Sequence, residues 1–228
     1  MTVDGLQMRI RTESRSTVIR RPSSNQNVLM PKRFLLFCLC FTCFSINAQK
    51  KNAGYEIHIR RAGCPMHIDG VLDEPAWTKA QVADSFFMVL PMDTSRAAVK
   101  TEVRMAYDGR FVYLSAVCFD DAKTGPYMVE SLRRDWNFVK NDNFIFFLDH
   151  FDDQTNGFTF GTNAAGGQWD GMMYEGGKVD LSWDNKWVSK VKHYPDRWIL
   201  EMAIPFKTLR YKKGITRWGI NFSRNDLK

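Results

Sequence analysis

From residue 55 onward, apolar and polar positions alternate in short runs, which is the period of β-strands. Residues 55–60 (Tyr-Glu-Ile-His-Ile-Arg) and 99–107 place apolar side chains at every second position, as a half-buried strand does. The runs 111–118 and 143–148 are apolar at nearly every position, which predicts central strands covered on both faces. Asp108-Gly109 separates two of these runs and predicts a hairpin turn.

The same spacing continues to the end of the chain. Four further strands are predicted, with glycine-rich or Pro-Asp turns between them: 157–162, 187–193, 197–204 and 218–222. About ten short strands with almost no helix are typical of an antiparallel sandwich or barrel. No linker or internal repeat divides the chain after residue 50, so we expect one all-β, antiparallel β-sandwich domain over residues 49–228.

Residues 67–77 interrupt this pattern and predict a small knot of turn and helix. Asp69-Gly70 offers the positive φ that a sharp reversal needs. Pro75 suits the first position of a helix, and Asp73 or Glu74 would cap its free N–H groups. Three apolar anchors remain, which we expect to tuck the knot against the end of the sandwich: Ile68, Leu72 and Trp77.

The first 48 residues read as a leader. Residues 1–29 are polar, rich in arginine and without periodicity, so we expect them to be disordered and, with Met30 as the true start, untranslated. Residues 30–48 have a basic start, an apolar run over 34–46 and a small residue, Ala48, at the end. This is the pattern of a secretory signal peptide, and the run is short for a retained anchor. We therefore expect export to the periplasm, cell surface or outer membrane.

The distribution of charge limits the class of binding partner, and the cysteine content limits the possible disulfide bonds. The chain carries a net charge of +7, but seven of its 32 Lys and Arg and two of its 25 Asp and Glu lie within residues 1–48, which leaves +2 for residues 49–228. A nearly neutral body without a basic run argues against nucleic-acid binding. Two cysteines follow the leader, Cys64 and Cys118; they could pair or remain free, since spacing alone does not place them within bridging distance.

The sequence shows no motif typical of a catalytic site or of a zinc-binding site. The four histidines are scattered without a His-x-x-x-His pair, so a zinc site is not indicated. There is no Gly-x-Ser-x-Gly motif, and the sequence makes no positive case for an enzyme. One acidic loop could offer hard oxygen ligands to a structural calcium ion or could be an ordinary solvated turn; its residues are Asp149, Asp152, Asp153 and Asn156.

The seven tryptophans fall into two groups. Four lie in apolar-periodic segments and are expected in the core: Trp77, Trp187, Trp198 and Trp218. Three stand among polar residues on predicted loops, where an exposed indole could stack on a pyranose ring while its neighbours bind hydroxyl groups. The candidate ligand-binding residues are Trp183, Trp136, Trp169, Arg134, Asn163 and Asp184. The alternative is that each ring covers a sheet edge or a loop.

Two stretches carry a family resemblance. Residues 68–77 (Ile-Asp-Gly-Val-Leu-Asp-Glu-Pro-Ala-Trp) and 198–209 resemble the opening and closing signatures of the family 9 carbohydrate-binding modules, and the resemblance covers roughly residues 55–223. It implies a jelly-roll-like β-sandwich that binds an oligo- or polysaccharide without catalysis. Such modules often accompany glycoside hydrolases, which implies a link to carbohydrate catabolism.

A narrower resemblance leaves an alternative open. Residues 133–135, 182–187 and 218–224 are similar to a subgroup of bacterial envelope proteins in which the module precedes a membrane β-barrel. By that resemblance the chain would be a periplasmic or plug-like scaffold domain without a sugar ligand, with a barrel encoded downstream as its partner. An enzyme of glycan breakdown, and a haem-binding relative of the sandwich, are further alternatives.

Overall fold

The computed structural model describes residues 7–10, 55–89, 95–120, 125–211 and 214–227, and gives the backbone alone for residues 7–10. The described residues belong to one compact unit; a second unit, Thr12–Gly54, lies outside them. The signal peptide expected over residues 30–48 therefore stays a prediction. Among the described residues, no helix has the length and apolar character needed to cross a membrane.

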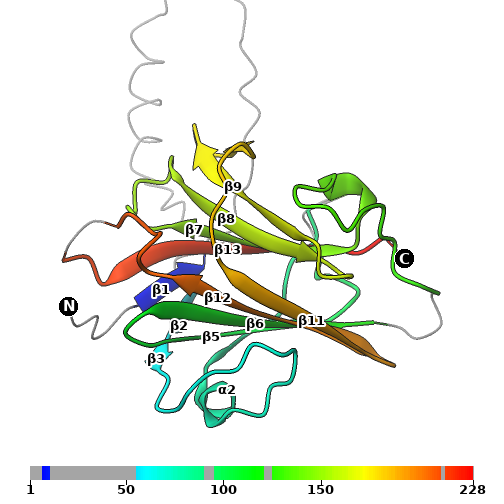
Figure 1. Ribbon diagram of the computed structural model, residues 1–228, viewed down its shortest axis with the longest axis horizontal. Helices are drawn as coiled ribbons and strands as arrows, with labels where there is room; N and C mark the ends of the chain where they lie inside the picture. Colours follow the sequence, from blue (N-terminus) through cyan, green and yellow to red (C-terminus); the bar gives the residue numbers. More distant parts are fainter. Residues whose placement is uncertain (1–6, 11–54, 90–94, 121–124, 212–213, 228) are drawn as a thin grey trace, which may run out of the picture. The chain divides into compact units, whose positions relative to one another are not determined.

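The described unit is a sandwich of two β-sheets. One sheet has seven strands in the order β10-β9-β8-β7-β13-β1-β2, and the other has six, β11-β12-β6-β5-β3 with β4 beside β5. Figure 1 shows the two layers, with helix α2 below the second sheet. The strands are β1 (Gln7–Ile10), β2 (Glu56–His58), β3 (Arg60–Arg61), β4 (Val82–Ala83), β5 (Thr101–Tyr107), β6 (Phe111–Phe119), β7 (Asn143–Asp149), β8 (Gly157–Asn163), β9 (Gln168–Tyr174), β10 (Lys178–Asp180), β11 (Val188–Tyr194), β12 (Arg197–Pro205) and β13 (Arg217–Asn225). The prediction of an all-β sandwich is confirmed.

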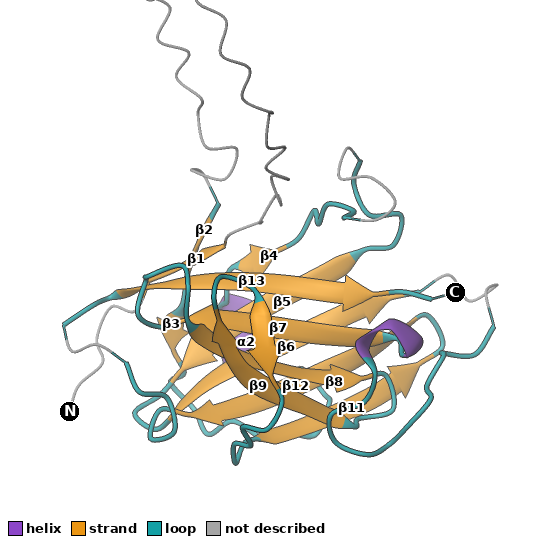
Figure 2. Ribbon diagram, turned by 90° about the horizontal axis from the view of Figure 1, so that it is seen from above, coloured by secondary structure: helices purple, strands orange, loops and turns teal. Residues whose placement is uncertain are grey.

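Among the described residues, helix is confined to two short pieces, α2 (Pro75–Lys79) and the 3₁₀ turn η1 (Phe138–Lys140). Figure 2 shows both among the strands, and η1 lies beside the C-terminal end of the described chain. The side chain of Asn225 holds this turn, because its Nδ2 donates to the Phe138 carbonyl over 3.1 Å.

The core forms where alternate side chains of the two sheets meet. Strands β6 and β12 contribute Leu114 and Met202, and the facing sheet contributes Phe146, Phe160 and Ile220, all essentially buried. Such interdigitated apolar layers are the main stabilising feature of a sandwich. The four tryptophans expected in the core are buried as expected: Trp77, Trp187, Trp198 and Trp218.

The predicted knot forms, with two corrections. Gly70 has a φ of 83°, and Pro75 begins α2. The N-cap residue is Glu74, but its side chain makes no capping hydrogen bond and instead accepts the His67 N–H over 2.8 Å. The knot also lies on the outer face of the six-stranded sheet, not at the end of the sandwich, because Trp77 packs on Ala106, Tyr113 and Ala203.

The N-terminal leader and the edge strands differ from expectation. Residues 7–10, which we expected to be disordered, form β1, which pairs in parallel with β13 and antiparallel with β2. Strands β3 and β5 are parallel as well, so the pairing is not wholly antiparallel. Both exceptions are short strands: β3 lies at the edge of its sheet, and β1 lies one strand in from the edge, between β13 and β2.

The two cysteines of the described residues are free. Cys118 is buried on β6, and Cys64 is partly buried in the segment before the knot. Burial raises the pKa of the Cys118 thiol to about 12, so this side chain behaves as a small apolar group.

Candidate functional site

The candidate site is built on the segment that connects β10 of one sheet to β11 of the other. Trp183 lies in this segment and is partly buried. Its ring stacks on Phe158 with 4.4 Å between centroids and 18° between planes. Phe158 in turn stacks on His150 at 4.6 Å. Trp183 is therefore the partly exposed end of a three-ring stack whose inner members are buried.

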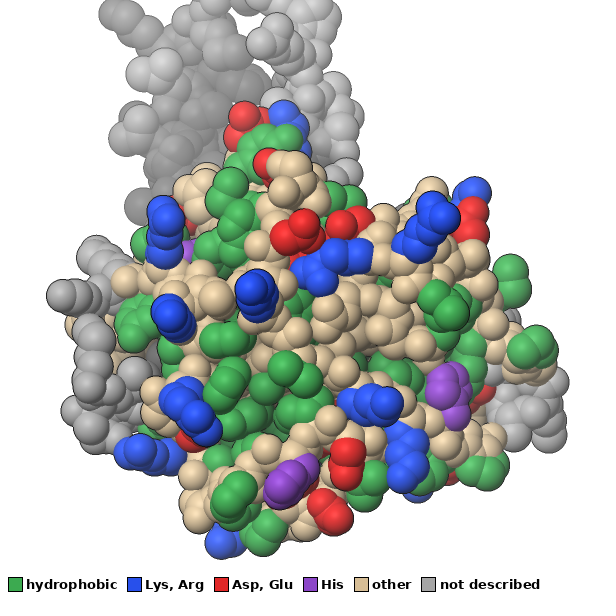
Figure 3. All heavy atoms as spheres, viewed as in Figure 1, with side chains coloured by type: hydrophobic (Ala, Val, Ile, Leu, Met, Phe, Trp, Pro, Cys, Tyr) green, Lys and Arg blue, Asp and Glu red, His purple; other side chains and the backbone are tan. Residues whose placement is uncertain are grey.

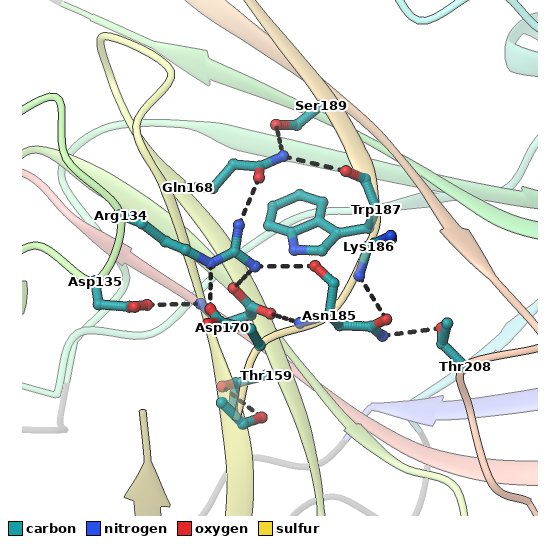
Figure 4. A network of polar contacts seen from close by, with 12 residues as sticks. Arg134, Asp135, Thr159, Gln168, Asp170, Asn185, Lys186, Trp187, Ser189 and Thr208 are labelled. Carbon is teal, nitrogen blue, oxygen red and sulfur yellow. Dashed lines mark hydrogen bonds and ion pairs between the residues drawn. The ribbon is translucent and has the colours of Figure 1, made fainter. Parts of the chain in front are cut away.

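A charged cluster surrounds the guanidinium of Arg134 (Figure 4). The guanidinium forms ion pairs with Asp170 and with Asp184, the latter over 2.7 Å between Nε and Oδ1. It also donates to Gln168 Oε1 over 2.9 Å and to the Asn185 carbonyl over 3.0 Å. Four polar groups, two on β9 and two on the segment that follows β10, therefore converge on one cation.

The two carboxylates of this cluster have opposite surroundings. Asp170 is fully buried, whereas the side chain of Asp184 is 69% exposed. Burial raises the pKa of Asp170, while the Asn185 N–H and the Arg134 charge oppose that shift. Asp170 thus holds Arg134 from the inside, and Asp184 presents its carboxylate to solvent beside Trp183.

The network also fixes the loop. Gln168 lies on the sheet edge and donates from Nε2 to the Trp187 carbonyl and, over 3.0 Å, to Ser189 Oγ of β11 (Figure 4). Asn185 donates from Nδ2 to Thr208 Oγ1 over 2.9 Å. These bonds tie β9 to β11 across the open edge of the sandwich. A loop anchored at both sides holds Trp183 in one position, as a binding site requires.

The chemistry of the arrangement is that of polyhydroxyl recognition. A partly exposed indole offers an apolar face. Beside it, Asp184 accepts hydrogen bonds and Arg134, about a third exposed, donates them. Sugars present apolar C–H faces and hydroxyl groups that both donate and accept, which is the complement of this set.

Two of the three tryptophans predicted on loops do not have an exposed ring, and one of them, Trp169, lies on strand β9. Trp136 is 4% and Trp169 is 6% exposed, and they pack on Ile145 against the outer face of the seven-stranded sheet. The indole N–H of Trp136 donates to the Gly167 carbonyl over 2.8 Å. The prediction of exposed rings here is wrong, because the loop before β7 folds over this face and covers both rings.

Asn163 is buried as well and makes local contacts. Its Nδ2 donates to the Ser131 carbonyl over 2.6 Å, and its Oδ1 accepts from the Ala165 and Gly167 N–H groups. The amide therefore closes the turn between β8 and β9. Of the six candidates, the structure brings together Trp183, Asp184 and Arg134.

Residues 68–228 match the family model described as "Carbohydrate family 9 binding domain-like". The chain belongs to this family. The match begins inside the knot, at Ile68, and extends over both sheets.

Two solved structures resemble this family 9-like module. Both are carbohydrate-binding modules of family 9 from Caldicellulosiruptor kristjanssonii. The one in complex with cellotriose has a TM-score of 0.51 and 18% identity over 74% of this chain and 76% of that chain. The one in complex with glucose has a TM-score of 0.51 and 16% identity over 74% and 78%. At these identities the likeness shows the shared fold. No curated protein matches the chain.

The acidic loop of the family 9-like module uses its carboxylates for its own backbone. Asp149 accepts from the N–H groups of Phe151, Asp153 and Gln154. Asp153 accepts from Thr155 and Asn156; burial opposes ionisation, but these bonds outweigh it and lower its pKa to about 2. Within the described residues, no three His, Cys, Asp or Glu side chains gather to hold a metal ion. Calcium at Asp149, Asp152, Asp153 and Asn156 stays a prediction without such a cluster.

One residue of interest, Glu201 on β12, is not among the candidates from the sequence. Its side chain is 0% exposed, although an isolated charge in a strand ordinarily faces solvent. It accepts from the Gly70 N–H over 2.7 Å, the Asp69 N–H over 3.1 Å and Trp77 Nε1 over 2.9 Å. The signal was present in the sequence, because residues 198–204 are apolar at every position except 201. A strand apolar on both faces is covered on both faces, so its carboxylate must be buried and paired.

Proposed function

We propose that the chain is an exported, non-catalytic carbohydrate-binding module that holds an oligo- or polysaccharide by stacking on Trp183 and that serves carbohydrate catabolism. The observation that carries this proposal is the partly exposed Trp183 ring beside the exposed carboxylate of Asp184. In this assignment a pyranose ring lies on the indole, and Asp184 and Arg134 bind its hydroxyl groups.

Family membership and the named complexes support the ligand class. The two similar modules are described in complex with cellotriose and with glucose. Cellotriose is therefore the first probe, and glucose tests whether one ring suffices. Stacking on one indole with a few hydrogen bonds gives an affinity between about 1 μM and 1 mM, or about −8 to −4 kcal/mol.

Calorimetric titration of cellotriose into the wild type and Trp183→Ala tests the proposal. We expect the substitution to weaken binding at least about tenfold, because removing an aromatic face forfeits about 1.5–3 kcal/mol of apolar burial. The matched control is Phe138→Ala, which removes another aromatic ring at the surface, on η1. Unchanged affinity in Trp183→Ala, or an equal loss in the control, would reject Trp183 as the stacking residue.

Export rests on the signal pattern over residues 30–48. Expression of the chain in a bacterial host with its leader intact, followed by N-terminal sequencing of the periplasmic fraction, tests it. The expected mature N-terminus is Gln49, and retention of the leader on cytoplasmic protein would refute export.

A further inference from the structure

A hollow lies on the outer face of the six-stranded sheet, between the knot and strand β11, apart from the Trp183 cluster. Its volume is about 510 Å³, and its walls include His67, Asp69, Arg110, Phe111 and Val188. This volume is in the range of small-molecule sites. In the space-filling view, hydrophobic side chains gather in the lower half of the face, above α2, with basic, acidic and histidine side chains around them (Figure 3).

One wall of the hollow is held in place by buried carboxylates. Glu74 accepts the His67 N–H over 2.8 Å, and Glu201 accepts the N–H groups of Asp69 and Gly70. Glu74 is 6% exposed and Glu201 is fully buried. The backbone of this wall is therefore fixed before any ligand arrives, which lowers the entropic cost of binding.

The floor and the rim have complementary chemistry. Phe111 is partly exposed and packs on Tyr113 at 5.9 Å between centroids. The Tyr113 hydroxyl donates to Asp108 over 2.8 Å, so it is already engaged. The exposed guanidinium of Arg110 lies 5.5 Å from the centre of the Phe111 ring. An apolar ring thus stands beside a strong donor.

His67 and Asp69 supply the remaining rim, and both are exposed. One oxygen of Asp69 accepts the Val71 N–H over 2.8 Å, which orients the carboxylate. Val188, 54% exposed, closes the hollow from β11. Donors and an acceptor around an apolar floor suit a neutral ligand with many hydroxyl groups. An anion would meet the carboxylate of Asp69 at unfavourable cost.

We propose that this hollow is a second saccharide-binding site, in which a neutral pyranose ring lies on Phe111 and its hydroxyl groups bind Arg110, His67 and Asp69. The site is formed by the knot, β6 and β11, and it shares no residue with the cluster around Trp183. One chain with two such sites contacts two glycan segments at once, which raises avidity for a polymer over a short oligomer.

The test follows backbone amide and indole NMR shifts of the full chain during titration with cellotriose. We expect shifts at Arg110 and Phe111 that saturate separately from those at Trp183. Arg110→Ala and Val188→Lys should each weaken the response of the hollow at least tenfold and leave the Trp183 response unchanged. Both residues are exposed, and thermal unfolding followed by circular dichroism checks that each variant keeps the fold.

The matched control is Lys190→Ala. Lys190 is exposed and lies on β11, as Val188 does, and its substitution should change neither response. No shifts at Arg110 and Phe111, or shifts there that neither variant weakens, would overturn the second site. A Trp183→Ala variant separates the two proposals, because loss of the Trp183 response alone leaves the hollow intact. Tenfold tighter binding of glucuronate than of glucose at the hollow would overturn the assignment to a neutral sugar.

Discussion

Arg134 has a structural role in its cluster, and under the proposed function it also binds the ligand. Its inner partner, Asp170, is fully buried, and a buried carboxylate that loses its cation is costly. Its outer partner, Asp184, is exposed and adds little to stability. The pair with Asp170 therefore holds the cluster, and in the proposed site the pair with Asp184 exchanges for hydrogen bonds to the ligand.

Arg134→Ala should lower the free energy of unfolding by about 3 kcal/mol at pH 7, because Asp170 would remain buried without its cation. Burial already raises the pKa of Asp170 above its ordinary value, and loss of Arg134 raises it further. The deficit should shrink as the pH falls toward 4, since the folded state then binds a proton that neutralises Asp170.

Urea denaturation at pH 7 and pH 4 measures this deficit. Arg133→Ala, an exposed neighbour, is the control and should stay near wild type at both values. A deficit that is the same at both pH values would contradict the role given to Asp170.

Trp136→Ala should destabilise the protein by about 3–5 kcal/mol, as expected for a large buried side chain replaced by alanine. Its ring is 4% exposed and contacts Trp169 at 6.2 Å between centroids. Guanidinium unfolding monitored by fluorescence gives the value. A loss below about 1 kcal/mol would show that the ring is not part of the packed interior.

The tryptophans show where neighbouring residues predict the burial of a side chain and where they do not. Core positions such as Trp198 were predictable, because the apolar period around them places the ring in the interior. Trp136 and Trp169 stand among polar residues, but their burial depends on a loop folding back over a sheet face. That is a long-range contact, which local polarity does not report.

At the scale of elements, the knot over residues 67–77 is anchored to the sheet through hydrogen bonds to one side chain, that of Glu201. Its Asp-Gly turn and the Trp77 indole all donate to Glu201, on a strand more than 120 residues later in the chain. Glu201→Gln places an amide N–H₂ against donors and should cost about 2 kcal/mol of stability. Limited proteolysis should then cut within the knot, whereas Glu175→Gln, at an exposed position, should leave it protected.

The same carboxyl predicts a pH dependence. Burial raises the pKa of Glu201 to about 7, above its ordinary value near 4.3. The folded state therefore holds this proton more tightly than the unfolded state, and stability from this group is lost as the pH rises from about 4.5 through about 7. The wild type should lose unfolding free energy over this window relative to Glu201→Gln. Parallel curves for the two proteins would refute the assignment.

At the level of elements, the sequence predicts long strands well and short ones poorly. The runs 111–118, 143–148 and 197–204 correspond closely to β6, β7 and β12, because each is a largely apolar run of six or more residues bounded by turn residues. Strands such as β3 and β4 contain two residues each, too few to show a period. Their existence depends on a neighbouring edge, here β5.

At the scale of the whole molecule, the presence of strand β1 conflicts with the expected cleavage after Ala48. The structure pairs β1 with β13 and β2, whereas signal-peptide removal would take β1 away. Because β1 has only four residues, we expect a chain that begins at Gln49 to keep its fold. Thermal unfolding should shift by less than about 5 °C, on the order of 1 kcal/mol for a chain of this size. Failure of this variant to fold would show that the leader is an integral strand.

The central claim concerns the place where the two sheets are joined by the Trp183 segment: this edge of the sandwich binds a sugar. A crystal structure of the complex with cellotriose tests it most directly. We expect a pyranose ring over the Trp183 indole within about 4.5 Å, with hydroxyl groups bonded to Asp184 and Arg134. Cellotriose bound only elsewhere, with the Trp183 ring uncovered, would contradict it.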